Sequence, residues 1–368
     1  MARTSQVVGT VGIADTVRRS WIDRTSGAVP LLLSIWLIVG LFVDAWSHSK
    51  TKIETFFSPW HAIFYAGFLV TAVWTIRSLA RSLTTRKEPA AAEIDILGVV
   101  GVPIFAMGGV TDMLWHSAFG IEEGVAVMMS PPHFLLFVGL VLITSGPFRK
   151  AWAAAGAHGN APTIRAFLPA VVSLALATSV VGLASNHLWG FSNADFMAVG
   201  ALENISVEFA PSTRGMHLLR EISHQRGVSN ILVTNLILLA PVLVMLRRWR
   251  LPFGSITMFL TLTTLLMAAL TGVPVQTMLL VSLITGLVAD WLAQTLQPSA
   301  QRVGQFRAFA TVVPLVLWSL YLTAVHIQWG IAWPPTVWGG ALLWTGASGL
   351  LLSLIAVPGT PPAGASAD

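Results

Sequence analysis

Long apolar runs separated by short polar stretches dominate the chain. A helix of about 20 apolar residues crosses a hydrocarbon layer of about 30 Å, and the runs have this length. Lipid offers no partner for exposed backbone groups, so each run is expected to be helical. The sequence therefore predicts an all-α, polytopic integral membrane bundle of about ten transmembrane helices. The predicted spans are 28–48, 59–82, 94–117, 130–148, 164–188, 217–246, 253–271, 274–296, 305–327 and 335–356.

Polar or small-residue segments flank the predicted transmembrane domain, residues 28–356. Residues 1–27 are expected to form a cytoplasmic lead-in, since no small-residue cleavage site follows the first apolar run. Residues 357–368 are rich in Pro and small residues and are expected to be a disordered cytoplasmic tail. Within the domain we distinguish three parts: hairpin 28–82, hairpin 94–148, and an outer loop and helix at 189–226.

Composition agrees with a membrane protein and narrows its chemistry. Hydrophobic residues make up 55% of the chain and charged residues 10%, whereas a soluble domain carries roughly 25% charged residues. There is no cysteine, which excludes disulfides, thiolate metal sites and cysteine nucleophiles. Any bound metal must therefore use His, Asp, Glu, Met or backbone oxygen.

The basic residues predict an orientation. All but five of the 21 lysines and arginines fall on one side of the predicted spans, which is therefore expected to be cytoplasmic and to carry both termini. This distribution accounts for the positive net charge, so nucleic-acid binding is not expected. We expect the protein in a cell inner or plasma membrane. The exceptions are Lys50, Lys52, Arg214, Arg220 and Arg226.

The histidines are distributed in the opposite way. Of the nine, only His158 is expected on the cytoplasmic side. Nothing in the positive-inside rule sorts neutral imidazoles, so this asymmetry indicates function. The histidines at or near the outer ends of spans are His48, His61, His116, His133, His187, His217, His224 and His326.

Two of the outer segments repeat one arrangement. The stretch DAWSHSKTKIETFFSPWH, residues 44–61, corresponds to DMLWHSAFGIEEGVAVMMSPPH, residues 112–133. Each opens with Asp and a His four residues later, and each closes with Ser-Pro-x-His. Both hairpins run out of and back into the cytoplasmic side, so the sequence predicts a parallel duplication of helices 1–2 and 3–4.

This spacing brings potential ligands together. Asp and His at i and i+4 share one helix face, and Ser-Pro-x-His is typical of a helix start with Ser as N-cap and Pro at N1. Each hairpin thus presents two histidines and one aspartate at one point of the outer interface. The predicted ligand sets are Asp44, His48, His61, and Asp112, His116, His133, with Glu122, Glu123, Met128 and Met129 in the second loop. The alternative for any one of these histidines is a polar residue at a helix end that only satisfies backbone groups or lies among headgroups.

A third candidate cluster precedes the sixth span. His217, Glu221 and His224 share a helical face, and His187 or His326 could complete a site there. The alternative is an interfacial amphipathic helix with solvated charges. Asp290, an acid within a span, is expected either to relay protons or to act as a cap.

Several His, a carboxylate and nearby Met without Cys suit copper best, followed by zinc and non-haem iron. Bis-histidine b-type haem is a competitor, but an Asp on the same helix face favours a free ion.

The D-x3-H-x12-H motif formed by Asp44, His48 and His61 resembles the copper-ligand motif of the C subunit of particulate methane and ammonia monooxygenases. That resemblance implies that these three residues bind copper near the outer face and that the complex inserts oxygen into small molecules. The second copy departs from the motif, with 16 residues between His116 and His133.

Three hypotheses of function follow. The first is a membrane metalloprotein, with copper as the best fit, that performs redox or oxygenase-type chemistry with an electron donor or other membrane subunits. The second is a metal-ion or proton-coupled transporter, which needs a polar path; the inner halves of spans one to six are almost purely apolar, and Asp290 is the exception. The third is a non-catalytic subunit that binds haem or quinone.

Overall fold

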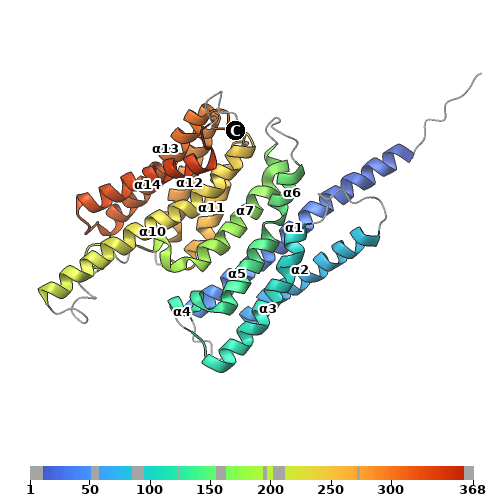
Figure 1. The fold of residues 1–368 in the computed structure, drawn as a ribbon, viewed down its shortest axis with the longest axis horizontal. Coiled ribbons are helices and arrows are strands. Elements are labelled where there is room, and N and C mark those ends of the chain that lie inside the picture. Colours follow the sequence, from blue (N-terminus) through green and yellow to red (C-terminus); the bar gives the residue numbers. More distant parts are fainter. Residues whose placement is uncertain are drawn as a thin grey trace, which may run out of the picture.

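A computed structural model describes residues 11–50, 58–84, 95–122, 124–154, 163–193, 197–201, 212–271 and 274–359, with the backbone alone for 11–27, 49 and 193. Within these ranges every regular element is helical, and nine helices are long and apolar enough to cross a membrane (Figure 1). The predicted fold class, an all-α polytopic membrane protein, is confirmed.

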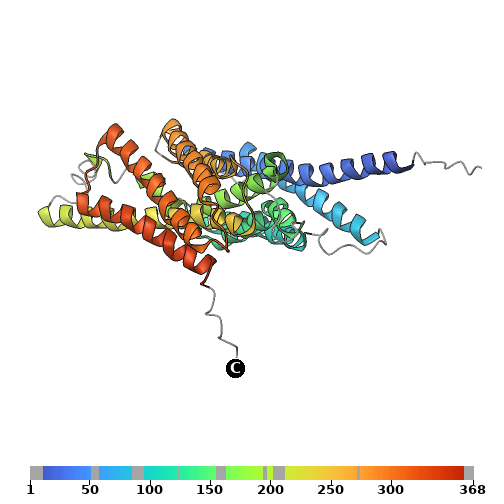
Figure 2. The same cartoon turned by 90° about the horizontal axis from the view of Figure 1, so that it is seen from above.

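The first half of the chain forms two helical hairpins. Helix α1 packs against α2, and α3 packs against α5, which α6 continues after a kink at Ser145. The bounds are α1 (Val11–Lys50), α2 (Pro59–Thr84), α3 (Ile96–Phe119), α4 (Val125–Met129), α5 (Pro131–Thr144) and α6 (Gly146–Ala154). Helix α1 has 40 residues, roughly 60 Å at 1.5 Å per residue, and its first turns project beyond its neighbours (Figures 1 and 2). The predicted lead-in and first span thus belong to one helix from Val11 onwards.

Glycines set the close packing of α3 on α5. A Cβ at Gly108 would lie 2.9 Å from the backbone nitrogen of Leu136, and one at Gly139 would lie 2.8 Å from that of Phe105. Membrane helices have little hydrophobic force to draw them together, so small residues that allow close approach stabilise such pairs. This contact fixes how the end of α3 lies beside the start of α5.

In the second half α10 packs mainly against α14, and α7 lies between the two halves (Figure 1). Helix α7 contacts α1, α5 and α6 as well as α10 and α11. The bounds are α7 (Ile164–Ala184), the 3-10 turns η1 (Asn186–Leu188) and η2 (Gly190–Asn193), α10 (Thr213–Arg248), α11 (Ser255–Ala268), α12 (Val275–Leu296), α13 (Val303–Trp329) and α14 (Pro335–Ala356).

The seventh predicted span is a short apolar helix, α11, and it begins against Asp290 of α12. With 14 residues α11 is roughly 21 Å long, which is less than the hydrocarbon thickness. The buried Asp290 carboxylate accepts bonds from the backbone N–H of Ile256 at 3.1 Å and from that of Thr257 at 2.9 Å. The Thr257 hydroxyl donates to it as well, at 2.6 Å. Of the two predicted roles for Asp290, the structure supports the cap.

The segment after α7 is partly a core element rather than an irregular loop. Trp189, Phe191 and Met197 are buried, and the Tyr321 hydroxyl donates to the Phe191 carbonyl at 3.2 Å. The backbone N–H of Gly190 donates to the Thr234 hydroxyl at 2.7 Å. Burial of these large side chains against α10 and α13 outweighs the absence of regular structure. Residues 194–196 and 202–211 lie outside the described ranges.

Candidate metal centre

The first ligand set comes together where α1 ends and α2 begins. Asp44 and His48 lie one turn apart near the end of α1, and His61 lies in the first turn of α2. The Asp44 Oδ2 atom is 3.8 Å from His48 Nε2 and 3.5 Å from His61 Nε2. Asp44 is buried, His61 is half-buried and His48 is exposed. One ligand atom from each residue lies within 4.8 Å of the others, so the three can hold one ion.

The second hairpin repeats this arrangement where α3 ends and α5 begins. Asp112 Oδ1 lies 3.3 Å from His116 Nε2 and 3.7 Å from His133 Nδ1. Asp112 is buried and both histidines are half-buried. Within the described residues, these two triads are the clusters of His and carboxylates close enough to hold a metal. We call them the first and the second triad.

The separations within the triads match coordination distances. An ion with tetrahedral bonds of about 2.1 Å holds its ligand atoms about 3.4 Å apart. The measured separations, 3.5 and 3.8 Å in the first triad and 3.3 and 3.7 Å in the second, lie near this value.

Three buried carboxylate oxygens accept no hydrogen bond in the described part of the chain. They are Asp44 Oδ1, Asp112 Oδ1 and Glu122 Oε2. A buried charged oxygen without a donor is costly, and the cost is removed when a cation binds it. The donor sets of both triads therefore fit a metal ion.

The surroundings of the His116 imidazole indicate most clearly that the second triad suits a cation. Its Nδ1 lies 3.1 Å from the carbonyl oxygen of Gly120, and because a carbonyl only accepts, Nδ1 carries a hydrogen. In the neutral ring Nε2 then carries a lone pair, and it lies 3.3 Å from Asp112 Oδ1. Two acceptors at this distance repel unless a cation or a proton lies between them. The alternative, a protonated ring donating to the carboxylate, would give Asp112 Oδ1 a hydrogen bond, and it has none.

Serine hydroxyls contact the histidine at the start of each returning helix. Ser58 Oγ lies 2.9 Å from His61 Nδ1 and accepts from the His61 backbone N–H at 3.1 Å, which confirms the predicted cap. Ser130 Oγ lies 2.5 Å from His133 Nδ1 and makes no cap hydrogen bond to the backbone. These serines were predicted as helix caps alone, and their contact with the imidazoles was not predicted. The repeated Ser-Pro-x-His was the available signal.

Both triads line a single cavity of about 880 Å³, which we call the metal cavity. Asp112 of the second triad acts electrostatically on Asp44 of the first, so the two triads lie within electrostatic reach of each other. The duplicated segments therefore both contribute to the lining of one cavity.

The loop of the second hairpin covers part of the metal cavity. This loop contains the short helix α4. Glu122 and Met128 line the cavity, and Trp115 Nε1 donates to Glu122 Oε1 at 2.6 Å. Met129 is exposed and does not line the cavity. Glu123 lies outside the described residues.

An aromatic residue missed by the sequence analysis distinguishes the two copies. Tyr65 follows His61 by one turn, lines the metal cavity and interacts electrostatically with both Asp44 and Asp112. The equivalent position in the second hairpin is Phe137, which also lines the cavity. The two halves of the centre are thus chemically unequal.

The predicted third cluster receives no such support. His224 Nδ1 lies 3.8 Å from Glu221 Oε1, but Glu221 is exposed, and His224 packs edge-on against Trp333. His217 is exposed on the first turns of α10, which project beyond the bundle (Figure 1). His187 is half-buried in η1 and His326 is exposed at the end of α13, and neither belongs to a metal cluster within the described residues.

The tryptophans near the predicted ligands have different surroundings. Trp189 is a core residue, Trp46 is exposed, and Trp115 donates to the cavity-lining Glu122.

The chain matches no protein-family model, no curated protein and no solved structure. The buried Asp/His/His triad in a helical membrane protein is therefore all that the structure adds to the resemblance seen in residues 44–61.

Proposed function

We propose that this protein is a membrane metalloprotein that binds one ion in each triad, copper being the best fit, and that it performs redox chemistry of the oxygenase type. The observation that carries the proposal is the His116–Asp112 pair: two acceptor atoms 3.3 Å apart in a buried site that also holds His133. Asp44, His48 and His61 are the corresponding ligands of the first ion.

Copper is favoured by the ligand type. Each triad offers two imidazoles and one carboxylate, with Met128 at the wall of the cavity and no thiolate. Imidazole suits copper, zinc, iron and nickel, and copper stands highest in the general order of affinity for such donors. Bound copper would supply one-electron and oxygen chemistry. The residues of the chain would hold the ions, orient the imidazoles through Ser58 and the Gly120 carbonyl, and enclose the substrate.

Haem fits these triads less well. In each triad the Asp oxygen lies within 4 Å of a nitrogen of both imidazoles. A porphyrin between the two histidines of one triad would have to displace that carboxylate.

The setting agrees with a small or apolar substrate. The metal cavity is lined by Leu41, Phe64, Leu136 and Phe137 as well as by the ligands. By the distribution of basic residues, we place it at the non-cytoplasmic face, with both termini in the cytoplasm. A redox cycle there also needs electrons from a donor or from other membrane subunits.

The proposal is tested by metal analysis with optical and electron paramagnetic resonance spectra of the purified protein. We expect about two copper ions per chain and, in the oxidised state, a cupric signal with nitrogen hyperfine splitting. A Soret band, or zinc as the stoichiometric metal, would contradict copper redox chemistry.

A further inference from the structure

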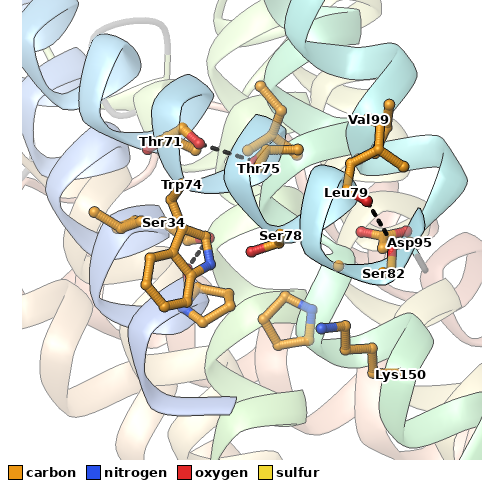
Figure 3. Close-up of a pocket in the computed structure, with 16 residues that line it drawn as sticks. Ser34, Thr71, Trp74, Thr75, Ser78, Leu79, Ser82, Asp95, Val99 and Lys150 are labelled. Carbon is orange, nitrogen blue, oxygen red and sulfur yellow. Dashed lines mark hydrogen bonds between the residues drawn. The ribbon is translucent and has the colours of Figure 1, made fainter. Parts of the chain in front are cut away.

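A second cavity, of about 110 Å³, opens at the end of the first helices opposite to the metal cavity. Serine and threonine hydroxyls line it, mostly along one face of α2 (Figure 3). We call it the hydroxyl chamber, and its hydroxyl groups are those of Ser34, Thr71, Thr75, Ser78 and Ser82. The inner halves of these helices were expected to be almost purely apolar, and the chamber adds a polar surface to them.

The hydroxyls present acceptor lone pairs to the chamber. Each of the four with a bond donates its hydrogen to a carbonyl of its own helix, at 2.7 to 2.9 Å: Ser34, Thr71, Thr75 and Ser82. Ser78 is exposed at the mouth, whereas Ser34 and Thr71 are buried at the inner end. A row of this kind can hold a file of water that leads inward from the mouth.

The charges at the mouth make the chamber a poor site for metal cations. Asp95 is paired with Arg149, whose Nη2 lies 2.7 Å from Oδ2 and whose Nε lies 3.0 Å from Oδ1. Lys150 also lines the mouth and adds a positive charge. The volume holds about three or four waters at about 30 Å³ each, which is less than the shell of a hydrated divalent ion.

The chamber and the metal cavity lie in line along the same helices. On α1 the chamber ends at Ser34 and the metal cavity begins at Leu41; on α2 the corresponding residues are Thr71 and Tyr65. Seven residues of helix correspond to about 10 Å. The apolar barrier between the two cavities is therefore about a third of a hydrocarbon layer of about 30 Å.

Four apolar side chains occupy this interval, and we call them the septum. Leu37, Ile38, Phe105 and Leu140 have no exposed surface, and Phe105 packs against Phe68 with ring centroids 4.2 Å apart. An apolar constriction of this kind stays closed by excluding water and opens when water enters.

We propose that the hydroxyl chamber is a water-filled half-channel that passes protons across the septum to the metal cavity. A proton crosses on a transient file of water, whereas a metal ion would lose its ligands against a septum with no polar atom to replace them. The inference rests on the two cavities and the septum, not on which metal the triads hold.

The absence of cysteine makes the chamber directly testable. Thr75→Cys places one thiol in the chamber, and Ile76→Cys places one on the adjacent lipid-facing position of the same helix. N-ethylmaleimide reacts with hydrated thiols, so in liposomes we expect Thr75→Cys to be modified at least about ten times faster. Equal rates would overturn the half-channel.

Proton flux tests the septum. Phe105→Ala removes a septum side chain, and Leu69→Ala removes a lipid-exposed one as the matched control. In liposomes with an internal pH dye and an imposed membrane potential, we expect faster proton entry for Phe105→Ala alone, and block of that entry by modification of Thr75→Cys in the same chain. Equal flux in both variants, or flux that modification does not reduce, would overturn the proposal.

Two controls keep this test separate from the proposed function. Leu140→Ala serves as a second septum variant where Phe105→Ala does not give a monodisperse protein. Flux is measured on metal-free as well as metal-loaded protein, so a chain that binds no metal but conducts protons overturns only the proposed function.

Discussion

Asp44 and His61 belong to different helices, yet Asp44 Oδ2 lies 3.5 Å from His61 Nε2. The packing of α1 against α2 thus brings a carboxylate from the end of one helix to an imidazole at the start of the next. Asp112 and His133 repeat this relationship in the second hairpin. The account of a paired centre depends on these two contacts between helices.

The Ser58 hydroxyl is expected to orient His61. Replacing it in Ser58→Ala removes the 2.9 Å contact to Nδ1 and frees the ring to turn. Loss of such a supporting bond typically lowers metal affinity 10- to 100-fold. We therefore expect the metal affinity of one of the two sites to fall at least about tenfold. Competition titration with a metal chelator measures it. Ser117→Ala is the control, since that hydroxyl bonds only within its own helix, and equal affinities in the two variants would exclude the orienting role.

Glu122 is expected to strengthen the second site alone. Its Oε2 is buried without a donor, and it lines the metal cavity near Asp112. Glu122→Gln removes this charge, so we expect weaker binding of one ion and unchanged binding of the other in the same titration. Glu221→Gln on the projecting end of α10 should have no effect. A loss at both sites would place Glu122 between the ions instead.

Gly108 is expected to be required for the shape of the second site. A Cβ there would come within 2.9 Å of the backbone nitrogen of Leu136 and push α5 from α3. We expect Gly108→Ala to lower the thermal midpoint and to weaken the second site while sparing the first. Gly340→Ala, which meets nothing within 4 Å, is the control. Unchanged metal affinity and midpoint would show that α5 can shift at no cost.

Asp290 is expected to matter for stability and not for metal or protons. Asp290→Ala leaves the backbone N–H groups of Ile256 and Thr257 without an acceptor. Two buried unsatisfied donors cost about 2 to 6 kcal/mol together, which denaturant unfolding in detergent measures. Asp290→Asn keeps one acceptor oxygen, so its free energy of unfolding should fall by less. Loss of proton flux in a stable Asp290→Asn protein would restore the relay role.

The sequence predicted most of the first half because its signals are local. Apolar runs of span length locate the helices, and an i, i+4 spacing places Asp44 beside His48 whatever the rest of the chain does. The helix start at Ser-Pro-x-His is equally local. The contact of His61 with Asp44 requires only that two consecutive helices pack against each other in antiparallel directions.

The remaining features depend on contacts between distant segments. No periodicity indicates that Asp290 meets the first turn of α11, 33 residues away, or that Trp333 covers His224. The sequence does not predict the hydroxyl chamber, because Ser34 and Thr71 are isolated polar residues among apolar neighbours. Only the packing of α1 on α2 brings them to one cavity.

The most direct test of the paired centre is the metal content of purified protein by elemental mass spectrometry. The wild-type chain is predicted to hold two ions, His48→Ala and His116→Ala one each, and the double variant none. His326→Ala, with an exposed histidine outside both triads, should hold two. No stoichiometric metal in the wild type, or a double variant that keeps its metal in a folded, monodisperse form, would contradict the account.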